Sequence, residues 1–239
     1  MNTTYQFNPI GIAHSCFTEK FGIPRQPGLV PAARAKLEIL PPYDQDEAFR
    51  GLEKFSHLWI VFVFHGIPED KWRPTVRPPR LGGNRRIGVF ATRSGFRPNP
   101  IGMSAVRQEG CRRKKGTLFL DVSGIDLLDR TPILDIKPYL PYADNVTGAI
   151  GGFAAETPLS SLSIEFTDQA RQACIRIEEK HPDFTDLLNQ VLKADPRPAY
   201  AGTQGQKSEY GLRLYDININ WTVRQKSIIV HAIADLGDE

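Results

Sequence analysis

The sequence predicts a mainly β protein, with a small barrel or sandwich in the first two-thirds of the chain and a small α+β unit after it. Short apolar stretches separated by Pro and Gly turns fill the first part, and few helical patterns interrupt them. After residue 167 the apolar residues recur at helical spacing, which marks the second unit. With 239 residues, 41% of them hydrophobic and 24% charged, the chain has the composition of a soluble globular protein.

The strands expected in the first part are short apolar stretches bounded by turn residues. They are residues 5–15, 36–43, 57–64, 86–92, 103–110 and 116–126. Residues 57–64, "HLWIVFVF", are nearly all β-branched, aromatic or Leu, which suits a strand buried on both faces. Residues 131–142 end in two prolines and are therefore expected to form an edge strand or an irregular one. Residues 46–55 are the expected short helix of this part.

The small and polar stretch of residues 144–161 is expected to be a linker or a long surface loop. It places a boundary between a first domain, residues 1–150, and a second domain, residues 151–239. In the second domain Thr167 can cap a helix, and another helix is expected after Pro182. Residues 210–221 alternate as a strand, and residues 227–235 can pair with it.

Several classes of protein are excluded by what the sequence lacks. It has no GxGxxG, P-loop, HExxH or GxSxG motif, and its five histidines lack metal-ligand spacing, so no metal is expected. Three widely spaced cysteines do not form a disulfide framework, which favours a reducing, cytoplasmic location. No signal peptide is recognised, and the most apolar stretch, residues 55–65, is too short to span a membrane.

The charge is distributed unevenly along the chain. Residues 71–115 contain thirteen Lys and Arg against one acid, Glu109, so this window carries +12 and the other residues together −9. Such asymmetry favours a polyanionic partner, and the excess of Arg over Lys suits phosphate groups. The alternative is a solvated face with compensating acids folded beside it. Near the end of the chain, Arg197 and Tyr200 in "DPRPAY" could stack on an unpaired base, or could belong only to a loop that stops a helix.

The stretch "RSGFRPNPIG", residues 93–102, is the most unusual motif of the chain. Pro98 and Pro100 fix their own φ angles and push the residues before them towards extended conformations, so the loop is stiff. Arg93 and Arg97 can present charge from it. A stiff loop with these side chains can bind a ligand, or it can simply be a rigid crossover between two strands.

Three other stretches offer polar groups for a ligand. Asp126 and Asp129 in "IDLLDRTP" could bind an ammonium group or a ribose diol, although Asp129 is also an ordinary turn residue. Gln26 in "FGIPRQPG" could contact a base edge or an amino-acid moiety, or lie in a plain surface loop. His65, at the end of an expected strand, could contact a ligand or only terminate the strand.

Four stretches in order, "PRQPG", "FSHLWIVFVFH", "ATRSGFRPNPIG" and "DLLDRTPILDIKPYLP", resemble the TrmO family, also called YaeB or TsaA-like. The resemblance implies a small antiparallel β-barrel (TsaA-like) that acts as a homodimer. It also implies transfer of a methyl group from S-adenosylmethionine to N6 of N6-threonylcarbamoyladenosine beside the anticodon, chiefly in threonine tRNA. The rival interpretation is a non-catalytic RNA- or nucleotide-binding module.

The resemblance also assigns roles to individual residues. The implied cofactor contacts are Pro24, Arg25, Gln26, His65, Gly66, Arg93, Met103, Asp126, Leu127, Leu128 and Asp129. The residues expected to contact tRNA are Arg77, Arg80, Arg85, Arg86, Arg97, Arg197 and Tyr200. No catalytic residue is identified, and Asp126 and Asp129 are the candidates for a base. Arg130 stands where the family pattern "LDGTP" has glycine. Because arginine tolerates a positive φ poorly, the turn is expected to differ from the family's backbone conformation or to be strained.

Overall fold

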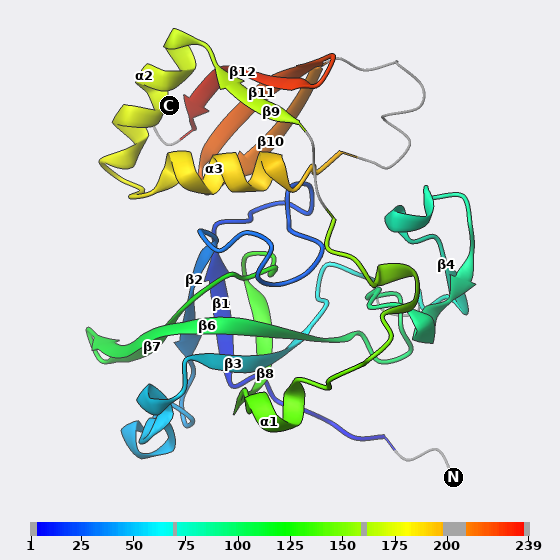
Figure 1. The fold of residues 1–239 in the computed structure, drawn as a ribbon. Helices are drawn as coiled ribbons and strands as arrows, with labels where there is room; N and C mark the ends of the chain where they lie inside the picture. Colours follow the sequence, from blue (N-terminus) through cyan, green and yellow to red (C-terminus); the bar gives the residue numbers. More distant parts are fainter. Residues whose placement is uncertain (1–3, 69–70, 159–161, 198–208, 237–239) are drawn as a thin grey trace.

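A computed structural model describes residues 4–68, 71–158, 162–197 and 209–236. Six antiparallel strands close into a barrel in the order β1-β2-β7-β6-β3-β8, seen in the lower part of Figure 1. Their bounds are β1 Gly11–Ser15, β2 Arg34–Ile39, β3 His57–Val63, β6 Ile101–Lys114, β7 Thr117–Ser123 and β8 Thr131–Pro138. The barrel expected from the turn-bounded strands is confirmed, and the sandwich alternative is wrong.

Side chains that point into the barrel form its core. Leu37, Leu58, Ile60, Leu120 and Ile133 are fully buried there. Along β3, buried and partly exposed residues alternate, so the expectation that residues 57–64 are buried on both faces is wrong. In a closed barrel only alternate side chains of a strand face inward, and the others remain on the outer surface.

Of the two alternatives given for residues 131–142, the edge strand is wrong and the irregular strand, β8, is confirmed. It lies between β1 and β3 within the barrel, so it is not an edge strand, although its pairing with β3 shifts register between Val61 and Phe62. Its two prolines, Pro132 and Pro138, stand next to the beginning and at the end of the strand. Because each lies near a strand end, the missing N–H groups do not interrupt the middle of the ladder.

Two other stretches of the first part are less regular than expected. Residues 46–55 form two short 3-10 helices, η1 Asp46–Phe49 and η2 Leu52–Lys54, separated by Arg50 and by Gly51, whose φ is +92°. Residues 86–92 contribute only a two-residue strand, β5 Ile87–Gly88, which pairs with β4 Thr75–Val76. Another 3-10 helix, η4 Val89–Ala91, follows at once.

The C-terminal part is a four-stranded sheet with two helices. Its strands follow the order β10-β11-β12-β9, with β9 Ser163–Phe166 parallel to β12 Ser227–Asp235. The helices are α2 Asp168–Glu178 and α3 Phe184–Lys193, and the Thr167 hydroxyl accepts a hydrogen bond from the Ala170 amide as the expected cap. Residues 210–221 make two strands, β10 Glu209–Leu214 and β11 Ile217–Arg224, because a turn at Tyr215 and Asp216 divides them.

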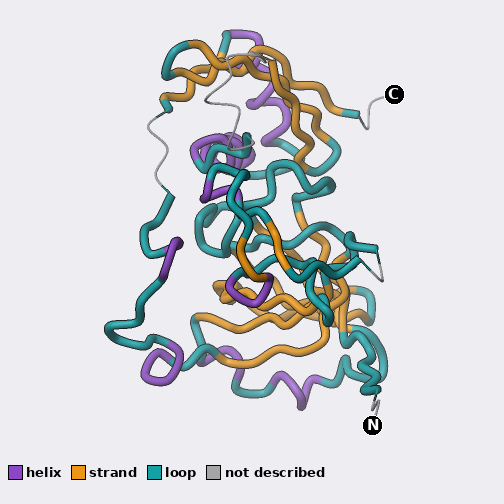
Figure 2. The backbone as a smooth tube through the Cα atoms, turned by 90° about the vertical axis from the view of Figure 1, so that its right-hand side faces the viewer, coloured by secondary structure: helices purple, strands orange, loops and turns teal. Residues whose placement is uncertain are grey.

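The barrel and the C-terminal part lie at opposite ends of the molecule, and the connecting segment runs along one side (Figure 2). That segment holds α1 Pro141–Asp144 and η5 Gly152–Ala154. The two parts contact directly, since the Tyr215 amide donates to the Cys16 carbonyl over 2.8 Å and the Ala32 amide donates to Gln190. Most of the buried hydrophobic residues form one cluster that extends through both parts. A boundary at residue 150 stays a prediction.

Candidate functional site

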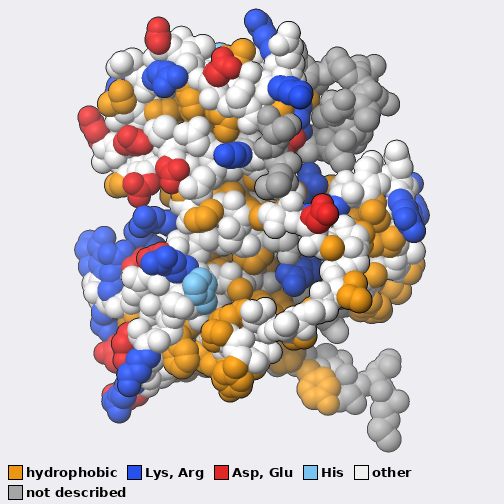
Figure 3. Space-filling view, in the orientation of Figure 1, with side chains coloured by type: hydrophobic (Ala, Val, Ile, Leu, Met, Phe, Trp, Pro, Cys, Tyr) orange, Lys and Arg blue, Asp and Glu red, His pale blue; other side chains and the backbone are white. Residues whose placement is uncertain are grey.

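A cavity of about 540 Å³ opens beside the barrel, where β3 and β6 meet the loops around them. Its walls come from the segment after β1, the end of β3, the loop of residues 93–102, the start of β6 and the turn after β7. On the face drawn in Figure 3, basic and hydrophobic side chains lie side by side across the middle of the molecule. The volume lies within the range of small-molecule and cofactor sites.

Nine of the eleven residues predicted to contact a cofactor line this one cavity. They are Pro24, Arg25, Gln26, His65, Gly66, Arg93, Met103, Asp126 and Leu128. They come from five separate stretches of the chain, which only the closed barrel brings together. Their contact with a cofactor itself stays a prediction.

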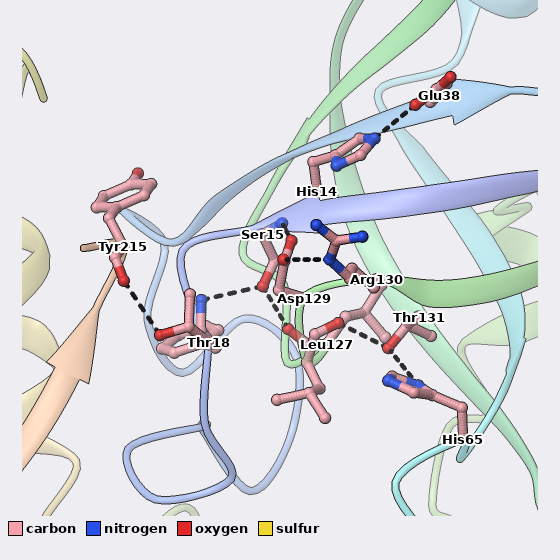
Figure 4. Close-up of polar contacts among 12 residues, drawn as sticks. His14, Ser15, Thr18, Glu38, His65, Leu127, Asp129, Arg130, Thr131 and Tyr215 are labelled. Carbon is pink, nitrogen blue, oxygen red and sulfur yellow. Dashed lines mark hydrogen bonds and ion pairs between the residues drawn. The ribbon is translucent and has the colours of Figure 1, made fainter. Parts of the chain in front are cut away.

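The other two, Leu127 and Asp129, are not among the residues that line the cavity. Leu127 is buried, and its carbonyl accepts a hydrogen bond from the Ser15 hydroxyl over 2.7 Å. The Asp129 carboxylate accepts from the Ser15 amide over 2.9 Å, as Figure 4 shows. These bonds fasten the turn after β7 to the end of β1. The Asp129 side chain is thus engaged within the turn, and neither residue is among those that line the cavity, so their contact with a cofactor stays a prediction.

Arg130 adopts the left-handed conformation that the family's glycine would favour. Its φ is +62°, and its guanidinium, 85% exposed, lies 3.9 Å from Asp129. Its backbone N–H donates to the Ala13 carbonyl over 2.8 Å. The turn keeps this shape despite the unfavourable residue, because Arg130 is tied to β1 on one side and precedes β8 on the other.

Asp126 is the carboxylate that lines the cavity. Its Oδ1 accepts a hydrogen bond of 2.5 Å from the hydroxyl of Ser104, whose side chain is buried in β6. Burial raises the pKa of Asp126 to about 6, while Ser104, its own backbone amide and the charge of Arg93 act to lower it. The group is thus balanced between the neutral and the ionised form at a pH close to neutral.

The loop of residues 93–102 forms one wall of the cavity. Arg93 reaches across to the segment after β1 and donates to the Gln26 carboxamide over 2.6 Å. Where the loop joins β6, a Cβ on Gly102 would lie 2.3 Å from the ring of Phe62, so only glycine lets these two strands approach. The binding alternative and the crossover alternative are thus compatible, since the loop connects two strands and also encloses the cavity.

Arg97 is used by the loop itself. Its guanidinium donates to the carbonyls of Thr92, over 2.7 Å, and Val89, over 3.3 Å. Val89 is the first residue of η4 and Thr92 follows its last, so Arg97 connects the two ends of this short helix. One guanidinium nitrogen of Arg97 is therefore used within the loop, and contact of Arg97 with tRNA stays a prediction.

The remaining residues expected to contact tRNA differ in their surroundings. Arg77, Arg80, Arg85 and Arg86 are exposed, and they lie together in and around β4, β5 and the short helix η3 Pro79–Leu81. Arg197 instead forms a double hydrogen bond with Asp195, over 2.7 and 2.9 Å, and its side chain is 14% exposed. Its charge is therefore neutralised within the chain. Tyr200 lies outside the described residues.

Several cavity residues escaped the sequence-based prediction. They are Lys20, Phe62, Phe64, Ser104, Thr131 and others of the same walls. Ser104 and Phe62 are found only because β3 and β6 are neighbours in the barrel. Within the described residues, no group of His, Cys, Asp and Glu is arranged to hold a metal ion. No helix there is long and apolar enough to cross a membrane.

A closed β-barrel with a cavity lined by three Arg, one Lys and one carboxylate defines a small-molecule-binding protein of an unusual, non-Rossmann kind. More particularly, the chain belongs to the tRNA-methyltransferase O family. Residues 12–145 match the N-terminal domain of that family, and residues 160–236 match its C-terminal domain. The resemblance noted from the sequence is thereby confirmed.

Individual relatives cover nearly the whole chain. It is 46% identical over 231 residues to the tRNA (adenine(37)-N6)-methyltransferase of Escherichia coli K12, covering 97% of this chain and 98% of that protein. It is 52% identical over 227 residues to a putative S-adenosylmethionine-dependent methyltransferase, RcsF, of Pseudomonas aeruginosa, covering 95% and 96%. A crystal structure of TrmO from Pseudomonas aeruginosa aligns with a TM-score of 0.79 at 43% identity, covering 97% and 99%.

Proposed function

We propose that this protein transfers a methyl group from S-adenosylmethionine to N6 of adenosine 37 in tRNA, and that this adenosine carries a threonylcarbamoyl group. The single observation that carries the proposal is the convergence of nine predicted cofactor contacts on one cavity. Family membership and the names of relatives that share nearly the whole chain support the reaction and the cofactor. The threonylcarbamoyl group is the finer part of the proposal.

The cavity residues fit the cofactor chemically. Asp126 is a carboxylate for the cationic or hydroxyl groups of the ligand, and Arg25 and Arg93 suit its carboxylate. Met103 and Leu128 provide apolar contact for an adenine ring. When bound, the cofactor supplies a methyl group on a positively charged sulfur.

The chain's part in the reaction is mainly to position the reacting nitrogen. The N6 atom of a urea-like group is a poor nucleophile, so holding it in line with the methyl group can supply much of the rate. Of the two candidate bases, Asp126 is the one that faces the cavity, and its pKa of about 6 is close to that of an effective general base. Asp129 is held in the turn by Ser15.

The proposed partners are tRNA and a second copy of the chain. The exposed arginines around β4 and β5 are suited to tRNA phosphates. Large apolar side chains are exposed near the cavity, with Phe90 at 74%, Met103 at 51% and Ile101 at 40%. Covering them in a homodimer would remove apolar surface from water.

The three cysteines form no disulfide, which is consistent with a cytoplasmic location.

One experiment tests the reaction. The protein is incubated with S-adenosylmethionine labelled in the methyl group and with tRNA that carries or lacks the threonylcarbamoyl group. We expect label only in the modified tRNA. Label in both would contradict the finer substrate assignment, and label in neither would favour the rival interpretation of a non-catalytic binding module.

A further inference from the structure

Lys20 lines the cavity from a position that no other assignment uses. It follows β1, and its ammonium donates a hydrogen bond of 2.5 Å to the carbonyl of Gly66 at the end of β3. A Cβ on Gly66 would lie 2.9 Å from Cε of Lys20, so the Lys20 side chain lies directly across Gly66. The same Cβ would lie 3.4 Å from Nζ of Lys20 and 3.4 Å from Cδ2 of Leu128, and all three residues line the cavity.

No carboxylate of the described residues lies within 4.0 Å of this ammonium. Its neighbour Glu19 is committed elsewhere, because its carboxylate accepts from the Arg213 amide over 2.9 Å. An ammonium has three donors, and the Gly66 carbonyl takes one of them. Lys20 is also exposed, so its remaining donors are accessible to an anion.

The excess of cationic side chains around the cavity also favours an anionic ligand. Four cations, Lys20, Arg25, Arg93 and Arg97, line it with the single carboxylate of Asp126. Arg25 and Arg93 are the cations proposed above for the cofactor's carboxylate, and one nitrogen of Arg97 is bonded to backbone carbonyls, whereas Lys20 has no such assignment and keeps donors for a second ligand. S-adenosylmethionine has two positive groups and one negative group, so it adds positive charge. A second ligand with an acidic group would balance it.

We propose that Lys20 binds the carboxylate of the threonylcarbamoyl group and so determines specificity for adenosine that carries this acid. The inference rests on the proposed function, because it names the group on that substrate which the same cavity recognises. An unmodified adenosine lacks the carboxylate and leaves the Lys20 ammonium without an anion. The same cationic chemistry would accept an anticodon-loop phosphate or the cofactor's own carboxylate, and the experiment separates these sources.

The test uses Lys20→Met, which removes the charge and keeps the length of the side chain. Lys36→Met is the matched control, because Lys36 is an exposed lysine on β2 and is not among the cavity residues. Two anticodon stem-loop RNAs are compared, one with the threonylcarbamoyl acid and one in which that carboxylate is a neutral amide. For each variant we measure kcat/KM for both RNAs, the Kd of both RNAs by fluorescence anisotropy, and the Kd of S-adenosylmethionine.

We expect Lys20→Met to lower kcat/KM for the acid RNA on the order of 10- to 100-fold, the usual effect of losing a hydrogen bond to a charged group. The amide RNA should be a poor substrate for the unaltered protein, and Lys20→Met should not lower its kcat/KM further. The Kd of the cofactor should change less than about twofold, since it does not contact Lys20 in this proposal. Lys36→Met should leave all three measurements unchanged.

Two results would overturn the assignment. Equal losses on the acid and amide RNAs would assign Lys20 to a phosphate or to the fold, and a weaker Kd for the cofactor would assign it to the cofactor's carboxylate. Because the Kd of each RNA is measured without methyl transfer, the test of Lys20 is independent of the test of the reaction. If the unaltered protein transfers no methyl group, the proposed function fails, yet a loss of acid-RNA binding confined to Lys20→Met would still support the contact, and no preference for the acid RNA would refute it.

Discussion

Burial raises the pKa of Asp126, the one carboxylate among the described residues that line the cavity, and the hydrogen bond from Ser104 opposes this rise. Ser104 is 1% exposed, and its hydroxyl lies 2.5 Å from Oδ1 of Asp126. The substitution Ser104→Ala removes this donor and leaves the burial in place. Because burial raises the pKa of Asp126 and the hydroxyl lowers it, the pKa should rise above its value of about 6.

The size of the change follows from the strength of such a bond. A hydrogen bond to a charged group contributes about 1.5–3 kcal/mol, which corresponds to roughly one to two pKa units. The pKa of Asp126 would then lie at roughly 7–8 in Ser104→Ala. If the ionised carboxylate binds S-adenosylmethionine, the affinity at pH 7 should fall roughly two- to tenfold, because fewer molecules carry the charge. Both proteins should bind alike near pH 9, where the carboxylate is ionised in each.

Titration calorimetry with S-adenosylmethionine from pH 5 to 9 measures this effect. Affinity should rise with pH in both proteins, with the midpoint displaced upwards in Ser104→Ala. The control is Ser15→Ala, which removes a buried hydroxyl bonded to the Leu127 carbonyl outside the cavity. An unchanged midpoint in Ser104→Ala, or the same displacement in Ser15→Ala, would refute the reasoning.

Three further predictions concern stability and are checked by thermal or denaturant unfolding. Arg130→Gly should stabilise the protein by about 1 kcal/mol, because φ is +62° there, whereas Arg130→Ala should not; equal effects would contradict this account. Gly102→Ala should cost about 1–3 kcal/mol, since its Cβ would lie 2.3 Å from the Phe62 ring, while Gly88→Ala, with nothing within 4 Å, should cost little. Asp126→Asn should raise stability at pH 7 by up to about 3 kcal/mol, because burial raises the carboxyl pKa from 3.8 to about 6. The folded protein then holds a proton that the unfolded chain has lost, so the stability from this group is full below pH 4 and declines as the pH rises towards 6; a stability that does not fall across this interval would contradict it.

Local patterns predicted most elements of the fold. Thr167 and the helical spacing after it specify α2, and the alternating residues 227–235 specify β12, because these signals depend only on neighbours in the chain. The exposure of the outer face of β3 depends instead on residues distant in the sequence. Trp59 lies on that face, half-covered by the ring of Tyr139 at 5.6 Å, and an apolar residue there looks the same in sequence as one in the core.

In the site, too, some features follow from neighbouring residues in the sequence and others only from the tertiary structure. The long string of residues 93–102 and its three companion stretches sufficed to name the family and nine of the cavity residues. Asp126 and Asp129 are the same residue type three positions apart, and no local signal separates them. Only the barrel turns Asp126 towards Ser104 in the cavity and Asp129 towards the backbone of Ser15. Likewise the direction of the Arg97 and Lys20 side chains depends on carbonyls from distant or folded-back segments, and their positions exist only once the strands have closed.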